Sequence, residues 1–90
     1  MTFEILIHPK ASRKINSLPA NVKEHIKQKL KEFSQDPFAF DVKKLIDAGK
    51  HPKYRLRIGD YRLIFTIDYE SRTIYVLRFF HRKEGYDKFL

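Results

Sequence analysis

The sequence has no cysteine, only three glycines and no long apolar run, and each shortage excludes a class of function. Without cysteine there is no disulfide framework, no thiolate nucleophile and no cysteine-based zinc site. The three glycines are scattered, so no glycine-rich loop can cradle phosphate groups. No segment approaches the roughly 20 apolar residues of a membrane helix, and the N-terminal residues do not resemble a signal peptide. We therefore expect a cytoplasmic protein that does not enter a membrane.

Metal ligands are also lacking. The four histidines stand at positions 8, 25, 51 and 81, and neither they nor the acidic residues show the spacing of known metal motifs. We therefore expect no metal and no cofactor. The chemistry left to such a chain is general acid–base catalysis and stabilisation of a charged transition state by cations.

Positive charge and aromatic side chains are plentiful. The 90 residues include 8 Phe and 5 Tyr and are 42% hydrophobic, which predicts one folded domain spanning residues 1–90. The 19 Lys and Arg exceed the 11 Asp and Glu by a formal charge of +8. Such an excess favours a polyanionic partner, above all nucleic acid, although it is also compatible with an ordinary solvated surface.

The N-terminal half predicts a strand followed by two helices. Residues 3–7 are apolar enough to predict a strand covered on both faces. Pro9 suits the first turn of a helix, and Asn21 with Glu24 three residues later resembles a capping box. Apolar residues then recur at spacings of three and four, as on one face of a helix. These positions are Ala11, Ile15 and Leu18 in the first helix and Val22, Ile26, Leu30 and Phe33 in the second.

The C-terminal half predicts three strands. Residues 34–52 follow no single period, so we expect a long connection with one helical turn around residues 42–46. Strands are then predicted at 53–58, 61–68 and 73–82. The expected fold is α+β, in the order β-α-α-β-β-β. A helical hairpin would pack on a mainly antiparallel four-stranded sheet, and a short C-terminal helix or tail would follow.

The hairpin between residues 53 and 68 places like charges together. A two-residue turn at Gly59 and Asp60 pairs apolar residues with apolar residues on one face, which supports this register. The same register sets Arg57 opposite Arg62 and leaves Arg55 and Lys53 on the same face. Facing like charges destabilise a hairpin by about 0.2–1 kcal/mol, and a bound phosphate would reverse the effect. The alternative is that the two arginines simply extend into water.

The segments YRLRIGDYRLIFTID and RTIYVLRFFHRKEGYDKF, with the order of elements above, resemble the RelE/ParE toxin superfamily, and more specifically a RelE-type mRNA interferase. The resemblance covers essentially the whole chain. It implies the toxin of a type II toxin–antitoxin system that cleaves messenger RNA in the ribosomal A site by attack of the 2′-hydroxyl. The implied partners are a cognate RelB-like antitoxin, the ribosome and mRNA, with operator DNA reached only through the antitoxin.

The resemblance also implies roles for individual residues. Arg62, Arg82 and Tyr86 match the arginines and tyrosine of the family, and His81 precedes the second arginine. Arg55 and Arg57 fall where these enzymes often carry lysines, and an arginine cannot lose a proton as a lysine can. The catalytic residues are therefore expected to be Arg62, His81, Arg82 and Tyr86, with either His81 or Tyr86 accepting the 2′-hydroxyl proton. The RNA and phosphate contacts are expected from Lys53, Arg55, Arg57 and Lys83.

Two alternatives remain open on the sequence. One is a ParE-like toxin that inhibits DNA gyrase without acting as an enzyme. The other is a catalytically inactive module that binds only nucleic acid or its antitoxin. The cationic and acid–base cluster in HRKEGY favours the nuclease, because a gyrase inhibitor has no need of it.

Overall fold

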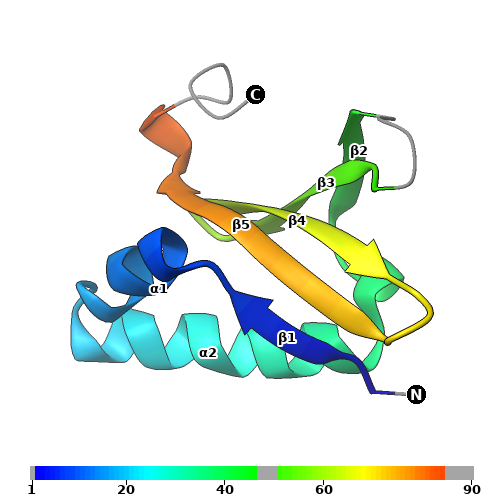
Figure 1. Cartoon of the computed structure of the whole chain (residues 1–90). Coiled ribbons are helices and arrows are strands. Elements are labelled where there is room, and N and C mark those ends of the chain that lie inside the picture. The colour runs from blue at the N-terminus through cyan, green and yellow to red at the C-terminus, as the bar shows by residue number, and fades with distance from the viewer. Residues whose placement is uncertain (1, 47–50, 85–90) are drawn as a thin grey trace.

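The computed structural model describes residues 2–46 and 51–84, in which two helices pack on one face of a five-stranded sheet (Figure 1). The helices are α1 (Pro9–Asn16) and α2 (Ala20–Gln35). The strands are β1 (Glu4–Ile7), β2 (Val42–Ile46), β3 (Lys53–Ile58), β4 (Tyr61–Asp68) and β5 (Thr73–His81). Two short 3-10 helices, η1 (Pro37–Ala39) and η2 (Arg82–Glu84), complete the described elements. The predicted α+β class is confirmed.

The sheet has the strand order β1-β5-β4-β3-β2. β1 pairs in parallel with β5, whereas the pairs β5–β4, β4–β3 and β3–β2 are antiparallel. β1 and β5, which are far apart in the sequence, therefore lie side by side in the middle of the view (Figure 1). β5 is thus an interior strand, paired on both of its sides.

The helices begin differently from each other. Before α1, the His8 ring nitrogen Nδ1 accepts a hydrogen bond from the Lys10 N–H at 3.1 Å, and Pro9 opens the helix as predicted. Before α2, the capping position belongs to Pro19, and no side chain caps the helix. The predicted capping box at Asn21 is therefore wrong, because the helix already starts at Ala20.

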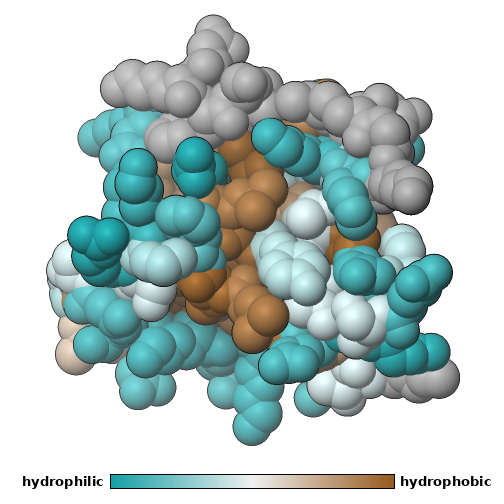
Figure 2. Space-filling view, in the orientation of Figure 1, coloured by the Kyte–Doolittle hydropathy of each residue, from teal (hydrophilic) through white to brown (hydrophobic). Residues whose placement is uncertain are grey.

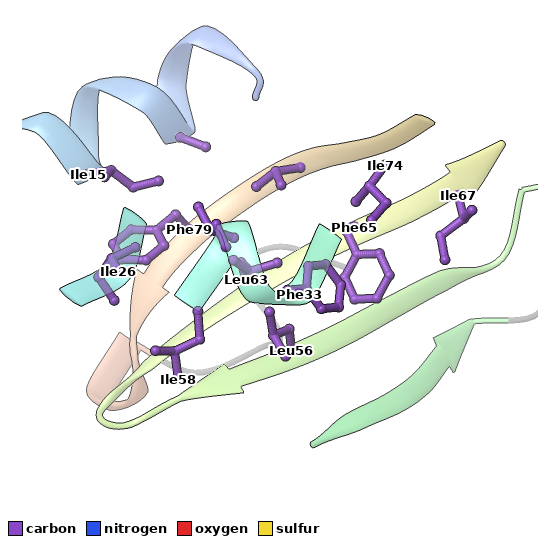
Figure 3. Close-up of a cluster of buried hydrophobic side chains, with 13 residues drawn as sticks. Ile15, Ile26, Phe33, Leu56, Ile58, Leu63, Phe65, Ile67, Ile74 and Phe79 are labelled. Carbon is purple, nitrogen blue, oxygen red and sulfur yellow. The ribbon is translucent and has the colours of Figure 1, made fainter. Parts of the chain in front are cut away.

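The apolar face of each helix meets the sheet. Figure 3 shows these side chains between the helices and the inner face of the strands. Phe33 of α2 lies edge-on to Phe65 of β4, with the ring centroids 5.0 Å apart. Leu56 and Leu63, opposite each other in β3 and β4, are fully buried beneath α2. Full burial of one such side chain contributes roughly 1.5–3 kcal/mol, so this layer is the main source of stability.

The strand content differs from the prediction at both edges of the sheet. Residues 42–46 form β2, which pairs antiparallel with β3, rather than a helical turn. Val42 then lies opposite Leu56 and packs against the core. At the other edge, β1 was expected to be covered on both faces, but Leu6 is 46% exposed. Figure 2 shows this apolar surface over β1 and β5, flanked by hydrophilic side chains.

Candidate nucleic-acid interface

The β3–β4 hairpin has the register that the sequence predicts. Its turn is formed by Gly59 and Asp60, and Gly59 has a φ of +56°, in the left-handed region that favours glycine. The apolar members of each strand face the helices, and Arg57 lies directly opposite Arg62 on the other face. The sequence therefore identified the like-charge pair correctly.

Each guanidinium of this pair is held by a separate acceptor. Arg62 Nη1 donates to the carbonyl oxygens of Gly59 and Tyr61, at 2.9 and 3.0 Å. Arg57 Nη1 lies 3.6 Å from a carboxylate oxygen of Asp41. The protein's own oxygens thus relieve the repulsion that the sequence led us to assign to a bound phosphate. The hairpin pair alone is no longer evidence for an anion.

Asp41 is the residue that sequence reasoning missed. It precedes β2, and its Oδ1 lies 3.3 Å from Arg55 Nη1, which also donates to the Asp41 carbonyl oxygen at 3.4 Å. The Arg55 side chain is only 8% exposed. Arg55 was expected to contact RNA, but the structure buries it against Asp41 instead. Arg57 remains half exposed beside it.

A bulge in β5 decides which side chains join the arginine face. Phe65 pairs with Val76, but Ile64 pairs with Arg78, so Leu77 is left without a partner between them. Beyond this bulge, Arg78 and Phe80 share the face of Arg62. A bulge shifts the alternation of a strand by one residue, and the sequence offers no glycine or proline at this point to reveal it.

His81 consequently lies on the opposite face from Arg57 and Arg62. It pairs with Tyr61, whose ring lies edge-on to the His81 ring with centroids 5.3 Å apart. Its Nδ1 accepts the Lys83 N–H at 3.2 Å. The surrounding hollow has a volume of about 310 Å³ and is lined in part by Lys14 of α1. The sheet therefore separates His81 from Arg57 and Arg62, two of the arginines with which the sequence grouped it.

Arg82 begins η2 beside the hairpin turn. Its N–H donates to the Asp60 carbonyl oxygen at 2.8 Å, and its Nε lies 3.5 Å from Asp60 Oδ1. Arg57, Arg62 and Arg82 thus flank one turn, and we call them the turn arginines. They come from three different elements, and Arg82 is largely exposed.

The remaining expected contacts lie at different distances from this turn. Lys83 is exposed in η2, next to Arg82. Lys53 shares the Arg57 face but lies four residues back along β3, about 13 Å away at the usual rise of a strand. Arg78 of β5, which the sequence did not single out, lies on the face of Arg62. Tyr86, the other proposed base, lies outside the described residues.

No group of three or more His, Cys, Asp or Glu side chains that could hold a metal ion occurs within residues 2–46 and 51–84. Neither described helix is long and apolar enough to cross a membrane.

The comparisons with known proteins agree with one another. A family model described as the ParE toxin of the type II toxin–antitoxin system parDE matches residues 5–86. Toxin RelE3 of Methanocaldococcus jannaschii is 33% identical over 79 residues, which cover 83% of this chain and 85% of that protein. The putative toxin RelE1 of the same organism is 28% identical over 88 residues, 94% of each chain.

Solved structures show the same relationship. The archaeal RelE–RelB complex from Pyrococcus horikoshii matches with a TM-score of 0.79 at 28% identity, over 94% of this chain and 100% of that one. The RelBE2 toxin–antitoxin complex of Mycobacterium tuberculosis matches with a TM-score of 0.76 at 27% identity, over 91% and 100%. With a family model that covers nearly the whole sequence and a curated RelE toxin above 30% identity, the chain belongs to the RelE/ParE superfamily of toxins of type II toxin–antitoxin systems.

Proposed function

We propose that this protein is a RelE-type mRNA interferase that cleaves messenger RNA in the ribosomal A site and so inhibits translation. The observation that carries the proposal is the gathering of Arg57, Arg62 and Arg82 around one turn. Guanidinium groups bind phosphate in a bidentate manner, and three of them can contact one phosphodiester and its neighbours. The curated relatives, which are named RelE toxins, support the same activity.

The proposed reaction uses the substrate's own hydroxyl. The 2′-oxygen attacks the adjacent phosphorus, the bond from phosphorus to the 5′-oxygen breaks, and the products are a 2′,3′-cyclic phosphate and a 5′-hydroxyl. A base takes the proton from the 2′-hydroxyl, and an acid or water supplies one to the leaving oxygen. Negative charge accumulates on the phosphate oxygens, where Arg62 and Arg82 stabilise it.

The base we propose is Tyr86. An imidazole is the more usual general base, but His81 lies on the helix side of the sheet, on the opposite face from Arg57 and Arg62. Tyr86 is the remaining candidate from the sequence, and nearby cations would favour its ionised form. The arginines at positions 55 and 57 cannot serve as bases. Lys53 and Lys83 would extend the contacts along the RNA backbone.

A cognate RelB-like antitoxin is the proposed protein partner. The P. horikoshii and M. tuberculosis structures are both toxin–antitoxin complexes. The net charge of +8 favours an antitoxin with an acidic toxin-binding segment. We expect both proteins in the cytoplasm, where the ribosomes are, with operator DNA bound through the antitoxin.

The deciding experiment is cleavage of mRNA on programmed ribosomes. The wild type should cut in the A site and leave 5′-hydroxyl ends, whereas the Arg82→Ala, Tyr86→Phe double variant should lose at least about 100-fold in rate. Arg13→Ala, which removes one exposed arginine from α1, is the matched control and should cut normally. Undiminished cutting by the double variant would reject this site. No cutting by the wild type would reject the enzyme.

The description of the family model favours a second candidate, a ParE-like toxin that inhibits DNA gyrase. A supercoiling assay with purified gyrase separates the two functions. Inhibition of supercoiling without mRNA cleavage would establish the second candidate. A protein that does neither but still binds RNA or an antitoxin would be an inactive binding module.

A further inference from the structure

Asp41 lies between two arginines of β3, Arg55 and Arg57. Its Oδ1 is 3.3 Å from Arg55 Nη1, and its Oδ2 is 3.6 Å from Arg57 Nη1. Both oxygens of the carboxylate are therefore directed at guanidinium groups of alternate residues in β3. Carboxylate and phosphate oxygens bind guanidinium groups in the same way. The carboxylate is thus an internal counterpart of a substrate phosphate.

The two contacts of Asp41 differ in strength. The contact with Arg55 is at hydrogen-bond distance, and the Arg55 side chain is almost fully buried. The contact with Arg57 is longer than a hydrogen bond, and both of its side chains are about half exposed. An exposed ion pair of this kind contributes little to stability, so another anion can replace it.

The main chain keeps Asp41 in place when its contact with Arg57 is lost. The Asp41 carbonyl oxygen accepts the Arg57 N–H at 3.2 Å and a hydrogen bond from Arg55 Nη1 at 3.4 Å. The following residues form β2, which pairs with β3. Only the Arg57 side chain has to turn for the exchange of anions to occur.

We propose that Asp41 determines the specificity of the site: its carboxylate occupies the anion-binding position of Arg57, and an RNA phosphate must displace it there while it remains bound to Arg55. This inference rests on the proposed function and adds a selection step to it. An isolated RNA strand has to compete with the internal carboxylate for Arg57. An mRNA held by additional contacts on the ribosome does so more easily, because the same loss is a smaller part of its binding free energy.

Arg55 has a corresponding positioning role. Because it is buried, it cannot follow the RNA, and it keeps the carboxylate close to Arg57 in both states. The two arginines of β3 therefore have different tasks, although they were grouped together on the sequence. Arg55 stays bound to the Asp41 carboxylate, whereas Arg57 exchanges this carboxylate for an RNA phosphate.

The first test is binding of a short single-stranded RNA by fluorescence anisotropy at several salt concentrations. Asp41→Asn keeps an oxygen for Arg55 but removes the negative charge beside Arg57. We expect it to bind RNA about two- to tenfold more tightly at low salt, with a steeper salt dependence. Glu24→Gln removes the same charge from an exposed position on α2 and should change the affinity less than twofold. An equal gain in RNA affinity in both variants would show that only the net charge matters, and this would overturn the proposal.

The second test uses the wild type and therefore does not depend on the folding of a variant. Inorganic phosphate is titrated while the Arg57 and Arg55 Nε resonances and the Asp41 carboxyl carbon resonance are followed by NMR. The Arg57 and Asp41 resonances should shift together and saturate at the same phosphate concentration, with a smaller change at Arg55. An unchanged Arg57 resonance, or an Arg57 shift without any change at Asp41, would refute the exchange.

The outcomes also separate this inference from the proposed function. If phosphate displaces Asp41 from Arg57 but programmed ribosomes are not cut, the nuclease assignment fails and the anion exchange stands. If the ribosome assay succeeds while Asp41→Asn leaves RNA affinity unchanged, the exchange fails and the nuclease stands.

Discussion

The Arg55–Asp41 pair predicts an unequal response to the loss of its two members. The Arg55 side chain is 8% exposed, whereas that of Asp41 is 55% exposed. Asp41→Ala leaves a buried cation with one carbonyl acceptor from this pair, whereas Arg55→Met leaves a carboxylate that water can still reach. A hydrogen bond to a charged group contributes about 1.5–3 kcal/mol. After allowance for the exposure of Asp41, we expect Asp41→Ala to cost about 1–2 kcal/mol.

Replacement of both members should recover most of this loss. Arg55→Met exchanges a buried cation for an apolar side chain of similar length and should cost less than about 1 kcal/mol. Once Met occupies position 55, the further change Asp41→Ala removes only the exposed contact with Arg57, which contributes little, so the double variant should resemble Arg55→Met alone. The coupling energy of the double-mutant cycle is then at least about 1 kcal/mol. Asp60→Asn, which alters the exposed pair with Arg82, is the matched control and should cost well under 1 kcal/mol.

Urea denaturation followed by circular dichroism measures all five proteins, provided that the slope of each transition stays the same. A cost of about 1 kcal/mol corresponds to roughly 4–8 °C in melting temperature for a domain of this size. If Asp41→Ala and Arg55→Met lowered the free energy of unfolding equally, or if the coupling energy were near zero, the burial of Arg55 would not be what makes the pair important for stability.

Three further predictions follow from other parts of the molecule. Phe33→Ala removes a fully buried ring and should lower the free energy of unfolding by about 3–5 kcal/mol in the same denaturation assay. Phe38→Ala, at a half-exposed ring, should lower it by less than about 1 kcal/mol. Similar losses for the two variants would contradict the described core. Gly59→Ala meets no atom within 4 Å, so its cost of about 1 kcal/mol should come from the positive φ alone, and an unchanged melting temperature would show that the turn adapts. His81→Gln should keep the mRNA cleavage rate within about threefold while Tyr86→Phe lowers it about 100-fold or more, and the reverse order in the ribosome assay would make His81 the base.

The parts of the fold with a strict period could be read from the sequence. The hairpin combines alternating apolar residues with a Gly-Asp turn, so both its strands and its register follow from local pattern. The helices likewise follow from apolar spacings of three and four. Local rules suffice in these segments because the buried face and the preferred backbone agree.

The parts that depend on distant pairing could not be read in this way. The segment VKKLI becomes a strand because β3 offers it an edge, and five residues with two lysines carry no clear period. The contact of Asp41 with Arg55 spans 14 residues and exists only when that edge pairing forms. The turn arginines lie near one another, but their part in catalysis stays a prediction. Asp41, which contacts both Arg55 and Arg57, could not be found from the sequence.

The unpaired Leu77 makes the length of β5 as important as its composition. Without this one residue, Val76 and Arg78 would be consecutive and would keep their partners Phe65 and Ile64, so the strand would alternate regularly with every side chain on its present face. If the strand instead kept Leu77 and lost the bulge, Leu77 would pair with Ile64, His81 would come to the face of Arg62, and Arg78 would turn toward the helices. For this protein, one extra apolar residue in β5 thus decides which side of the sheet carries Arg78 and which side carries His81.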